Sequence, residues 1–258
     1  MYKEAIQDAI STHELPSEWS SALLSEAEHV AQKKKTAKYR KDLRKLPFVT
    51  IDGEDAKDFD DAIYCVKNTS GYRLYVAIAD VSFYVEANSK LDKEAKKRGT
   101  SIYFPETVIP MLPENLSNGI CSLRPNEDRC SMICEMSIDL DGTRKKYKFY
   151  SGLINSKARL TYNQVEKHFK KSSSIKQSIV RESIKHLFDL TNVRLKLRNQ
   201  RRALEINPTE AILELNKNKE VNNIVIKKNL FAHKLVEESM LLANESAAEF
   251  MHDRLDLG

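Results

Sequence analysis

The chain has 258 residues, of which 41% are hydrophobic and 31% charged, and its formal net charge is +5. This length and hydrophobic content allow a substantial buried core and do not indicate an intrinsically disordered chain. They fit one large domain with or without a small appendage. The modest positive charge permits nucleic-acid binding but does not argue for it. Whether the chain binds nucleic acid must therefore be judged from its motifs.

The four cysteines form no CxxC pair and are too few for a disulfide scaffold. The sequence has neither a signal-peptide pattern at its N-terminus nor a run of about 18 apolar residues. We therefore expect reduced thiols, a cytoplasmic location and no membrane partner.

The first 45 residues place apolar side chains at helical spacing, which predicts two helices joined by a polar link. A basic run begins at Lys33–Lys35, and further lysines and arginines extend it to Lys45. Such a run is usually a solvated helix face, but it can also contact phosphate, and the sequence leaves both interpretations open.

Strands are predicted from Leu46 onward, because β-branched and aromatic runs stand between turn residues. The first three runs are Phe48–Ile51, Ala62–Val66 and Tyr72–Val81. Asp141-Gly142 is the two-residue turn that best matches strand twist, and it predicts a hairpin between strands at 132–140 and 143–153.

A short charged helix is predicted over residues 89–98, where Gly99 suits the helix C-terminus, and a proline-bearing loop is expected over residues 105–125. The later elements are helices near 178–200 and 229–254 and a short hairpin around 216–220. The expected fold is therefore mixed α/β, with a mixed, mainly antiparallel sheet in the first half and flanking helices in the second.

Six of the ten residues from Asp52 to Asp61 are acidic, and predicted strands stand on both sides of them. Asp52 ends one strand and Asp58, Asp60 and Asp61 come at the start of the next, so a loop that closes back gathers four carboxylates. Such a cluster repels itself unless a cation neutralises it. Because every ligand is an oxygen atom, Mg²⁺, with Mn²⁺ as the alternative, fits better than zinc.

Magnesium held by a few carboxylates keeps coordination positions for phosphate and water, and two ions about 3.5 to 4 Å apart can stabilise both the attacking and the leaving oxygen. The plainer alternative is an acidic surface loop that only confers solubility. Phe59 argues against it, since an apolar ring inside the run indicates an anchored loop. A calcium EF-hand fits worse, because Gly53 falls in the wrong place and no glutamate closes a twelve-residue loop.

The string from Leu46 to Ala62 resembles the signature of RNB-type ribonucleases, the RNase II/RNase R family. Val76–Ser82 follows as the family has it. Three further matches are similar to the ribonuclease R branch: Arg98–Pro105, Ile109–Leu123 and Leu235–Asn244. The resemblance implies an RNB ribonuclease catalytic domain over residues 46–258, preceded at 1–45 by a helical linker that leads out of a missing RNA-binding region.

The resemblance also implies an activity. It predicts a Mg²⁺-dependent 3′-to-5′ exoribonuclease that takes the 3′ end of single-stranded RNA into a narrow channel and hydrolyses it processively to nucleoside 5′-monophosphates, without a small-molecule cofactor. The aspartates that match the family's metal-binding cluster are Asp52, Asp58, Asp60 and Asp61. Of these, Asp60 and Asp61 are the predicted catalytic residues.

Three further residues are implied to contact RNA: Tyr103, Tyr162 and Glu238. Tyr103 matches the tyrosine that stacks on the terminal base, and Tyr162 matches one that lines the catalytic cavity. Plainer interpretations stand beside these: core packing for Tyr103, a place near a helix start capped by Thr161 for Tyr162, and solvent-facing helix acids for Glu237 and Glu238. The resemblance does not tell which glutamate faces the substrate.

Two departures from the family bear on activity. Ile206 stands where the family commonly has an aromatic residue opposite the stacking tyrosine, and the family's arginine-rich phosphate-binding segment is expected beyond Gly258. The resemblance therefore also allows a catalytically impaired RNA-binding fragment, incomplete at its C-terminus. Another metal-dependent phosphotransfer enzyme is a more distant alternative, because it leaves the matches outside the acidic loop unexplained.

Overall fold

The computed structural model describes residues 2–32, 38–105, 107–171, 175–203, 211–216, 220–226 and 229–255. The chain forms two compact units, each assembled from separate stretches. The larger one, here called the sheet unit, comprises Lys34–Val81, Ile120–Leu204 and Leu230–Gly258. The smaller one, here called the hairpin unit, comprises Met1–Lys33, Ser82–Gly119 and Glu205–Asn229.

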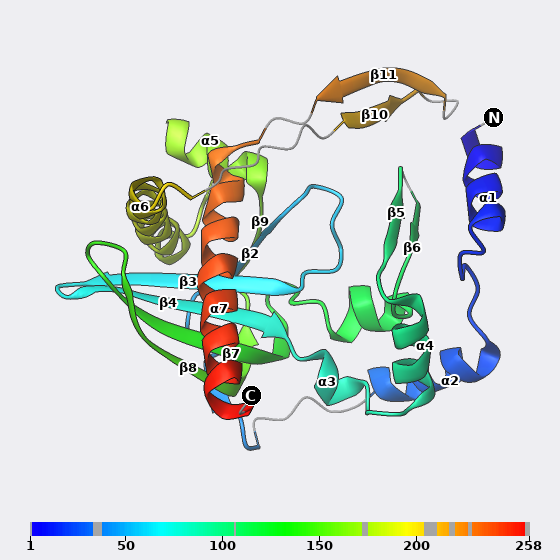
Figure 1. Ribbon diagram of the computed structural model, residues 1–258, viewed down its shortest axis with the longest axis horizontal. Coiled ribbons are helices and arrows are strands. Elements are labelled where there is room, and N and C mark those ends of the chain that lie inside the picture. The colour runs from blue at the N-terminus through cyan, green and yellow to red at the C-terminus, as the bar shows by residue number, and fades with distance from the viewer. Residues whose placement is uncertain are drawn as a thin grey trace. The chain divides into compact units, whose positions relative to one another are not determined.

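The sheet unit contains a sheet whose seven described strands follow the order β1-β8-β7-β4-β3-β2-β9 (Figure 1). Their bounds are β1 (Lys41–Asp42), β2 (Val49–Asp52), β3 (Asp61–Asn68), β4 (Gly71–Ala79), β7 (Asp128–Asp139), β8 (Arg144–Asn155) and β9 (Ala158–Thr161). The β1–β8 and β2–β9 pairs are parallel and the other pairs are antiparallel. The predicted mixed, mainly antiparallel sheet is confirmed.

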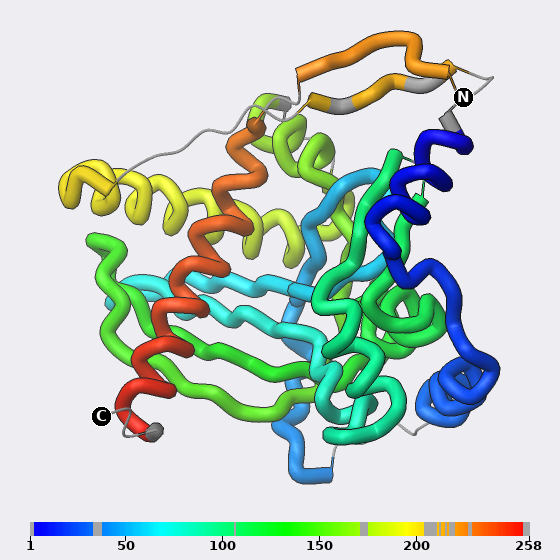
Figure 2. The backbone as a smooth tube through the Cα atoms, turned by 45° about the vertical axis from the view of Figure 1, so that its right-hand side comes forward, coloured from blue at the N-terminus to red at the C-terminus, as the bar shows by residue number. Residues whose placement is uncertain are grey.

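One face of this sheet is covered by helices. They are α5 (Tyr162–Lys171), α6 (Ser178–Gln200) and α7 (Phe231–Leu255), and α7 crosses the strands in both views (Figures 1 and 2). Leu74 and Met136 on the strands join Ile184 and Leu235 on the helices in a common buried core. Burying each such side chain contributes roughly 1.5 to 3 kcal/mol, which accounts for the helix layer.

The opposite face carries a second core. Successive strand residues point to opposite faces, so Ile63 belongs to the core under the helices and Ala62 to the second core. This second core contains Phe48, Ile133 and, from the acidic stretch, Phe59, which is 7% exposed. The loop between β2 and β3 is therefore anchored, as the sequence predicts.

The hairpin unit is built from short elements. They are α1 (Tyr2–Thr12), α2 (Ser21–Ala31), α4 (Lys90–Arg98), β5 (Ile102–Phe104), β6 (Thr107–Ile109), β10 (Ala211–Leu215) and β11 (Val221–Ile226). The Arg98 side chain, 1% exposed, lies 3.5 Å from the centroid of the Trp19 ring. It donates to the carbonyls of Glu18 (2.7 Å) and Pro110 (3.1 Å), so one buried cation joins the helices to the β5–β6 hairpin.

Most predicted elements are present. The two N-terminal helices are α1 and α2, the charged helix is α4 with Gly99 at a φ of +73°, the hairpin around 216–220 is β10–β11, and the long helices are α6 and α7. None of the described helices is long and apolar enough to span a membrane. The basic run at Lys33–Lys35 and the predicted clamp position Ile206 lie outside the described residues.

Two predictions need correction. The expected loop at 105–125 contains β6 and a π-helical turn, η1 (Asn115–Ile120), while a short helix α3 (Val81–Tyr84) follows β4. In the β7–β8 hairpin the strands end at Asp139 and resume at Arg144, so the connection is longer than two residues. The cause is a register shift after Ser137, and Gly142 supplies the positive φ of +87° that the longer turn needs. The predicted domain boundary after residue 45 stays a prediction.

Candidate functional site

The strand register brings the acidic residues to one edge of the sheet. β2 ends at Asp52, which pairs with Thr161 of β9 in parallel register. β3 begins at Asp61 and runs antiparallel to β2, with Val49 opposite Ile63. Extended toward the loop, this register places Asp52 next to the start of β3, so the chain closes back as the sequence predicts.

The backbone of the loop is fixed on both sides of Phe59. Its N–H donates to Ser122 Oγ at 3.0 Å, and its carbonyl accepts from the N–H of Leu123 at 2.8 Å. The Ser122 hydroxyl in turn donates to the carbonyl of Lys57 at 2.7 Å. The carbonyl of Asp60 accepts from the N–H of Ala79 on β4 at 2.8 Å. The solubility-loop alternative does not explain such anchoring.

Arg159 on β9 holds the other end of the loop, and sequence reasoning did not single it out. Its Nη2 donates to the carbonyl of Gly53 at 2.8 Å and also to the carbonyl of Glu54. Asn163 adds a hydrogen bond from Nδ2 to Glu54 Oε1 at 3.0 Å. The first turn of the loop is thereby tied to β9 and to the start of α5.

The carboxylates interact strongly with one another. Burial, and then the charges of Asp52 and Asp60, together raise the pKa of Asp61 from 3.8 to about 6. The pKa of Asp60 is also raised, first by desolvation and then by Asp58 and Asp52, although part of its surface reaches solvent. In addition, Asp61 Oδ2 is buried without a hydrogen-bond partner among the described residues. A proton or a cation at this position reduces the repulsion between the carboxylates and gives the buried Asp61 oxygen a partner.

The carboxylate oxygens of these residues are ligands that suit a hard cation, but the side chains are not yet arranged around a common point. Within the described ranges, no three acidic, histidine or cysteine side chains converge closely enough to hold a metal ion as they stand. Asp52 Oδ1 accepts from the N–H of Gly53 at 2.6 Å, so one of its oxygens is engaged by its own loop. Ligation by all four aspartates therefore requires their side chains to move closer together.

Tyr162 lies beside this loop because it directly follows the partner of Asp52. Thr161 and Gln164 form a reciprocal capping box at the start of α5, with Gln164 N–H to Thr161 Oγ1 at 3.1 Å and Thr161 N–H to Gln164 Oε1 at 3.0 Å. The predicted cap at Thr161 is confirmed. Burial raises the pKa of Tyr162 to about 12, and Asp52 and Asp61 contribute to this shift. The ring of Tyr162 stacks on that of His233, a second residue that sequence reasoning missed.

Tyr103 lies on β5 in the hairpin unit. Its side chain is 66% exposed, so the interpretation as ordinary core packing is wrong. An exposed aromatic ring on a hairpin suits contact with a ligand, and the predicted contact with a terminal base stays a prediction.

Glu238 is not solvent-facing. It is 2% exposed and lies between Arg198, at 2.6 Å, and Arg194, at 3.5 Å. Glu237 is more exposed and pairs with Arg198 at 3.2 Å. The helix-acid interpretation is therefore wrong for Glu238, and its predicted RNA contact stays a prediction.

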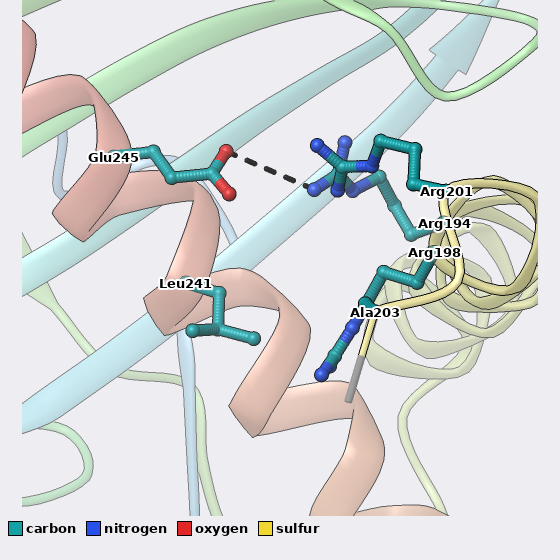
Figure 3. Close-up of a pocket in the computed structure, with 6 residues that line it drawn as sticks. All are labelled: Arg194, Arg198, Arg201, Ala203, Leu241 and Glu245. Atoms are coloured by element: carbon teal, nitrogen blue, oxygen red, sulfur yellow. Dashed lines mark ion pairs between the residues drawn. The ribbon is translucent and has the colours of Figure 1, made fainter. Parts of the chain in front are cut away.

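A pocket of about 350 Å³ adjoins these ion pairs between α6 and α7 (Figure 3). Its lining residues are Arg194, Arg198, Arg201, Ala203, Leu241 and Glu245. Arg194 faces Glu245 across 3.8 Å, so acidic partners offset much of the arginine charge. The ion pairs thus serve mainly to join α6 to α7.

The sequence was compared with models of protein families and with known proteins. Residues 40–257 match the family model of the RNB domain. Ribonuclease R of Escherichia coli K12 is 46% identical over 255 residues, which cover 96% of this chain and 31% of the relative. This chain therefore spans about a third of the length of that relative.

Two solved structures are also similar. Mycoplasma genitalium RNase R in complex with ribose methylated single-stranded RNA has a TM-score of 0.92 and 34% identity, covering 96% of this chain and 39% of that one. The same enzyme in complex with double-stranded RNA has a TM-score of 0.92, with 96% of this chain and 45% of that chain covered. The domain match, the identity to curated relatives and the shared fold lead to one conclusion: the chain belongs to the RNB domain family.

Proposed function

We propose that this chain is the catalytic part of a 3′-to-5′ exoribonuclease that hydrolyses RNA processively to nucleoside 5′-monophosphates. The observation that carries the proposal is the anchored acidic loop, in which Asp61 keeps a buried oxygen without a partner among the described residues and a raised pKa. Membership of the RNB domain family supports the substrate class, since relatives of this fold have been solved with RNA bound.

The cofactor in this proposal is Mg²⁺, with Mn²⁺ as the alternative, held by Asp52, Asp58, Asp60 and Asp61. When bound, such an ion supplies positive charge for the phosphate oxygens and the acidity that water needs to act as a nucleophile. Asp60 and Asp61 are the proposed catalytic pair, because they stand at the rigid start of β3, where hydrogen bonds fix the backbone.

The proposed reaction balances as a simple hydrolysis. A water oxygen forms the new bond to phosphorus, and the bond between phosphorus and the 3′ oxygen of the preceding nucleotide breaks. One nucleoside 5′-monophosphate leaves, and the shortened strand keeps a 3′ hydroxyl for the next cycle. Tyr162 supplies a flat wall beside the carboxylates against which the terminal nucleotide can rest, and Tyr103 supplies an exposed ring for stacking.

The substrate in this proposal is the 3′ end of single-stranded RNA, and the proposed location is the cytoplasm. All four cysteines are free and buried, which agrees with a reducing compartment.

A second candidate is RNA binding without cleavage. One observation favours it: within the part of the chain that the structure describes, no metal-binding group is preassembled. The two candidates differ in turnover, which makes them separable by a single assay.

The test compares one single-stranded oligoribonucleotide labelled at its 3′ end with the same strand labelled at its 5′ end, in Mg²⁺, in Mn²⁺ and in chelator. The proposal predicts that the 3′ label is released at once as a 5′-mononucleotide, while the 5′ label moves from the full-length strand to a short end product with few strands of intermediate length. Release of the 5′ label first, or cleavage into internal fragments, would contradict the proposed direction. Bound but intact RNA in either metal would favour the second candidate.

A further inference from the structure

We propose that His233 is a positioning residue that fixes the Tyr162 ring in the candidate site. The inference rests on the proposed function, because it concerns how the wall beside the acidic loop is kept in place. It adds a residue on α7 that no sequence motif assigned to the site.

The two rings form a tight stack. Their centroids are 4.1 Å apart and their planes are inclined by 19°. One face of Tyr162 is therefore covered by imidazole, which limits rotation of the ring about its side-chain torsions. Substrate can then approach only the remaining face and the edges of Tyr162.

His233 is itself held by the start of α7. Its N–H donates to the carbonyl of Leu230 at 3.0 Å, while the N–H of Leu230 donates to His233 Nδ1 at 3.0 Å. The bond to Nδ1 is the half of a capping box that glutamate or glutamine usually supplies, and the bond from the His233 N–H goes to the Leu230 backbone. Nδ1 also lies 3.3 Å from the carbonyl of Leu230, so the tautomer decides whether it accepts from the Leu230 N–H or donates to this carbonyl. The imidazole is thus fixed by backbone groups before it meets Tyr162.

The two helix starts are also joined to each other. Glu166 on α5 accepts from the N–H of Ala232 on α7 at 3.3 Å through Oε2. Tyr162 is the first residue of α5, directly after Thr161, which forms the capping box with Gln164, and His233 stands in the first turn of α7. The stack therefore rests on two capped helix ends that are bonded together, which makes it a stiff support.

This support adjoins the acidic loop on one side. Thr161, next to Tyr162, is the strand partner of Asp52. The charges of Asp52 and Asp61 contribute to the raised pKa of the Tyr162 hydroxyl. A change in the tilt of the Tyr162 ring alters the space beside these carboxylates. His233 consequently influences how a nucleotide is placed without reaching the reacting atoms.

The plainer role for His233 is to cap α7 and nothing more. Two substitutions separate the roles. His233→Gln keeps a side-chain acceptor suited to a capping box but removes the ring, whereas His233→Phe keeps a ring for stacking but removes the acceptor. His252→Gln, on the same helix and 82% exposed at its side chain, is the matched control.

Steady-state cleavage of a single-stranded oligoribonucleotide and thermal unfolding are measured for each variant. We expect His233→Gln to unfold near the wild-type temperature but to lose about five- to tenfold in kcat/KM, while His233→Phe unfolds earlier and keeps most of its kcat/KM. Wild-type kinetics for His233→Gln, or activity losses that simply follow stability in both variants, would overturn the inference.

A readout that needs no activity separates this inference from the proposed function. In ¹H–¹³C spectra of protein with labelled tyrosine, the Tyr162 ring signal, assigned by its loss in Tyr162→Phe, should carry a ring-current shift from His233. The shift should disappear in His233→Gln and persist in His233→Phe. An unmoved signal in His233→Gln refutes the positioning role even in an active enzyme, whereas the expected shifts in a protein that cleaves no RNA refute only the proposed function.

Discussion

Arg159 donates from Nη2 to the carbonyl of Gly53, a residue 106 positions away in the sequence. The guanidinium also donates to the carbonyl of Glu54 and lies 5.7 Å from the centroid of the Phe59 ring. One side chain of β9 therefore holds the start of the acidic loop and touches its apolar anchor. Its positive charge also lies next to a loop that is rich in carboxylates.

Replacing Arg159 by alanine should loosen the loop. We expect kcat/KM to fall about tenfold to a hundredfold, with a higher Mg²⁺ requirement, because residues that orient metal ligands typically have effects of this size. The loss in free energy of unfolding should be smaller, about 1 to 3 kcal/mol. Mg²⁺ titrations of cleavage measure the metal requirement, and urea unfolding measures the free energy of unfolding. Arg159→Lys keeps the charge but not the forked donor, so its values should lie between those of the wild type and the alanine variant. An unchanged Mg²⁺ requirement in the alanine variant would speak against this role.

Phe59 should matter chiefly for stability. Because its ring is 7% exposed, Phe59→Ala should cost about 3 kcal/mol in the free energy of unfolding. Phe59→Leu preserves most of the volume and should cost less than about 1.5 kcal/mol. Urea denaturation followed by circular dichroism gives both values. Equal stability of the alanine variant and the wild type would mean that the loop is not anchored by this ring.

The stability of the metal-free protein should depend on pH through Asp61. Its pKa rises from 3.8 to about 6 on folding, mainly through burial and then through Asp52 and Asp60. The folded state therefore binds more protons than the unfolded state between these values, so stability falls as pH rises through this range. Asp61→Asn should remove much of that fall, and Mg²⁺ should oppose it above about pH 6.

Urea unfolding in chelator at about pH 5 and about pH 7 measures this dependence. Asp253→Asn serves as the control, since Asp253 has an exposed side chain. A metal-free protein that becomes more stable over this interval, with the same slope in Asp61→Asn, is incompatible with the account.

Glu238 and Glu237 should differ sharply despite being neighbours. Glu238→Gln removes the charge that pairs with buried Arg194 and with Arg198, and should cost about 3 kcal/mol of stability. Glu237→Gln, at an exposed site, should cost less than about 1 kcal/mol. Thermal unfolding and RNA affinity are measured together. A loss of RNA affinity without a loss of stability in Glu238→Gln would instead assign Glu238 to the substrate.

Tyr103 should contribute to RNA binding and little to folding. Since its side chain is 66% exposed, Tyr103→Ala should leave the unfolding temperature almost unchanged. If the ring stacks on a base, the same variant should weaken RNA binding by about 1 to 3 kcal/mol, and Tyr103→Phe should bind nearly as well as the wild type. Fluorescence anisotropy with a labelled oligoribonucleotide provides the affinities. Equal binding by Tyr103→Ala would remove this residue from the RNA-contacting set.

Local patterns in the sequence account for much of the fold. Runs of β-branched and aromatic residues between turn residues predicted β2, β3 and β4. Glycine at a helix end predicted where α4 ends, and Phe59 inside the acidic stretch predicted the anchored loop. These features depend on neighbours in the chain. The register of the β7–β8 turn was missed because a bulge inside the hairpin, rather than the turn residues, sets its length.

Contacts between distant residues could not be predicted in this way. Arg159 reaches Gly53 only because β9 pairs in parallel with β2, and His233 meets Tyr162 only because two helix starts are joined. The adjacent acids Glu237 and Glu238 look alike in sequence, and only the packing of α6 against α7 buries one of them.

The most direct test of the central claim compares turnover with RNA affinity in Asp60→Asn and Asp61→Asn. The account predicts that both variants bind a single-stranded oligoribonucleotide about as tightly as the wild type in Mg²⁺ but cleave it at least about a hundredfold more slowly. Measuring binding and cleavage on the same preparation excludes loss of folded protein as the cause of slow cleavage. Cleavage at the wild-type rate by either variant would contradict the claim that this acidic cluster performs the chemistry.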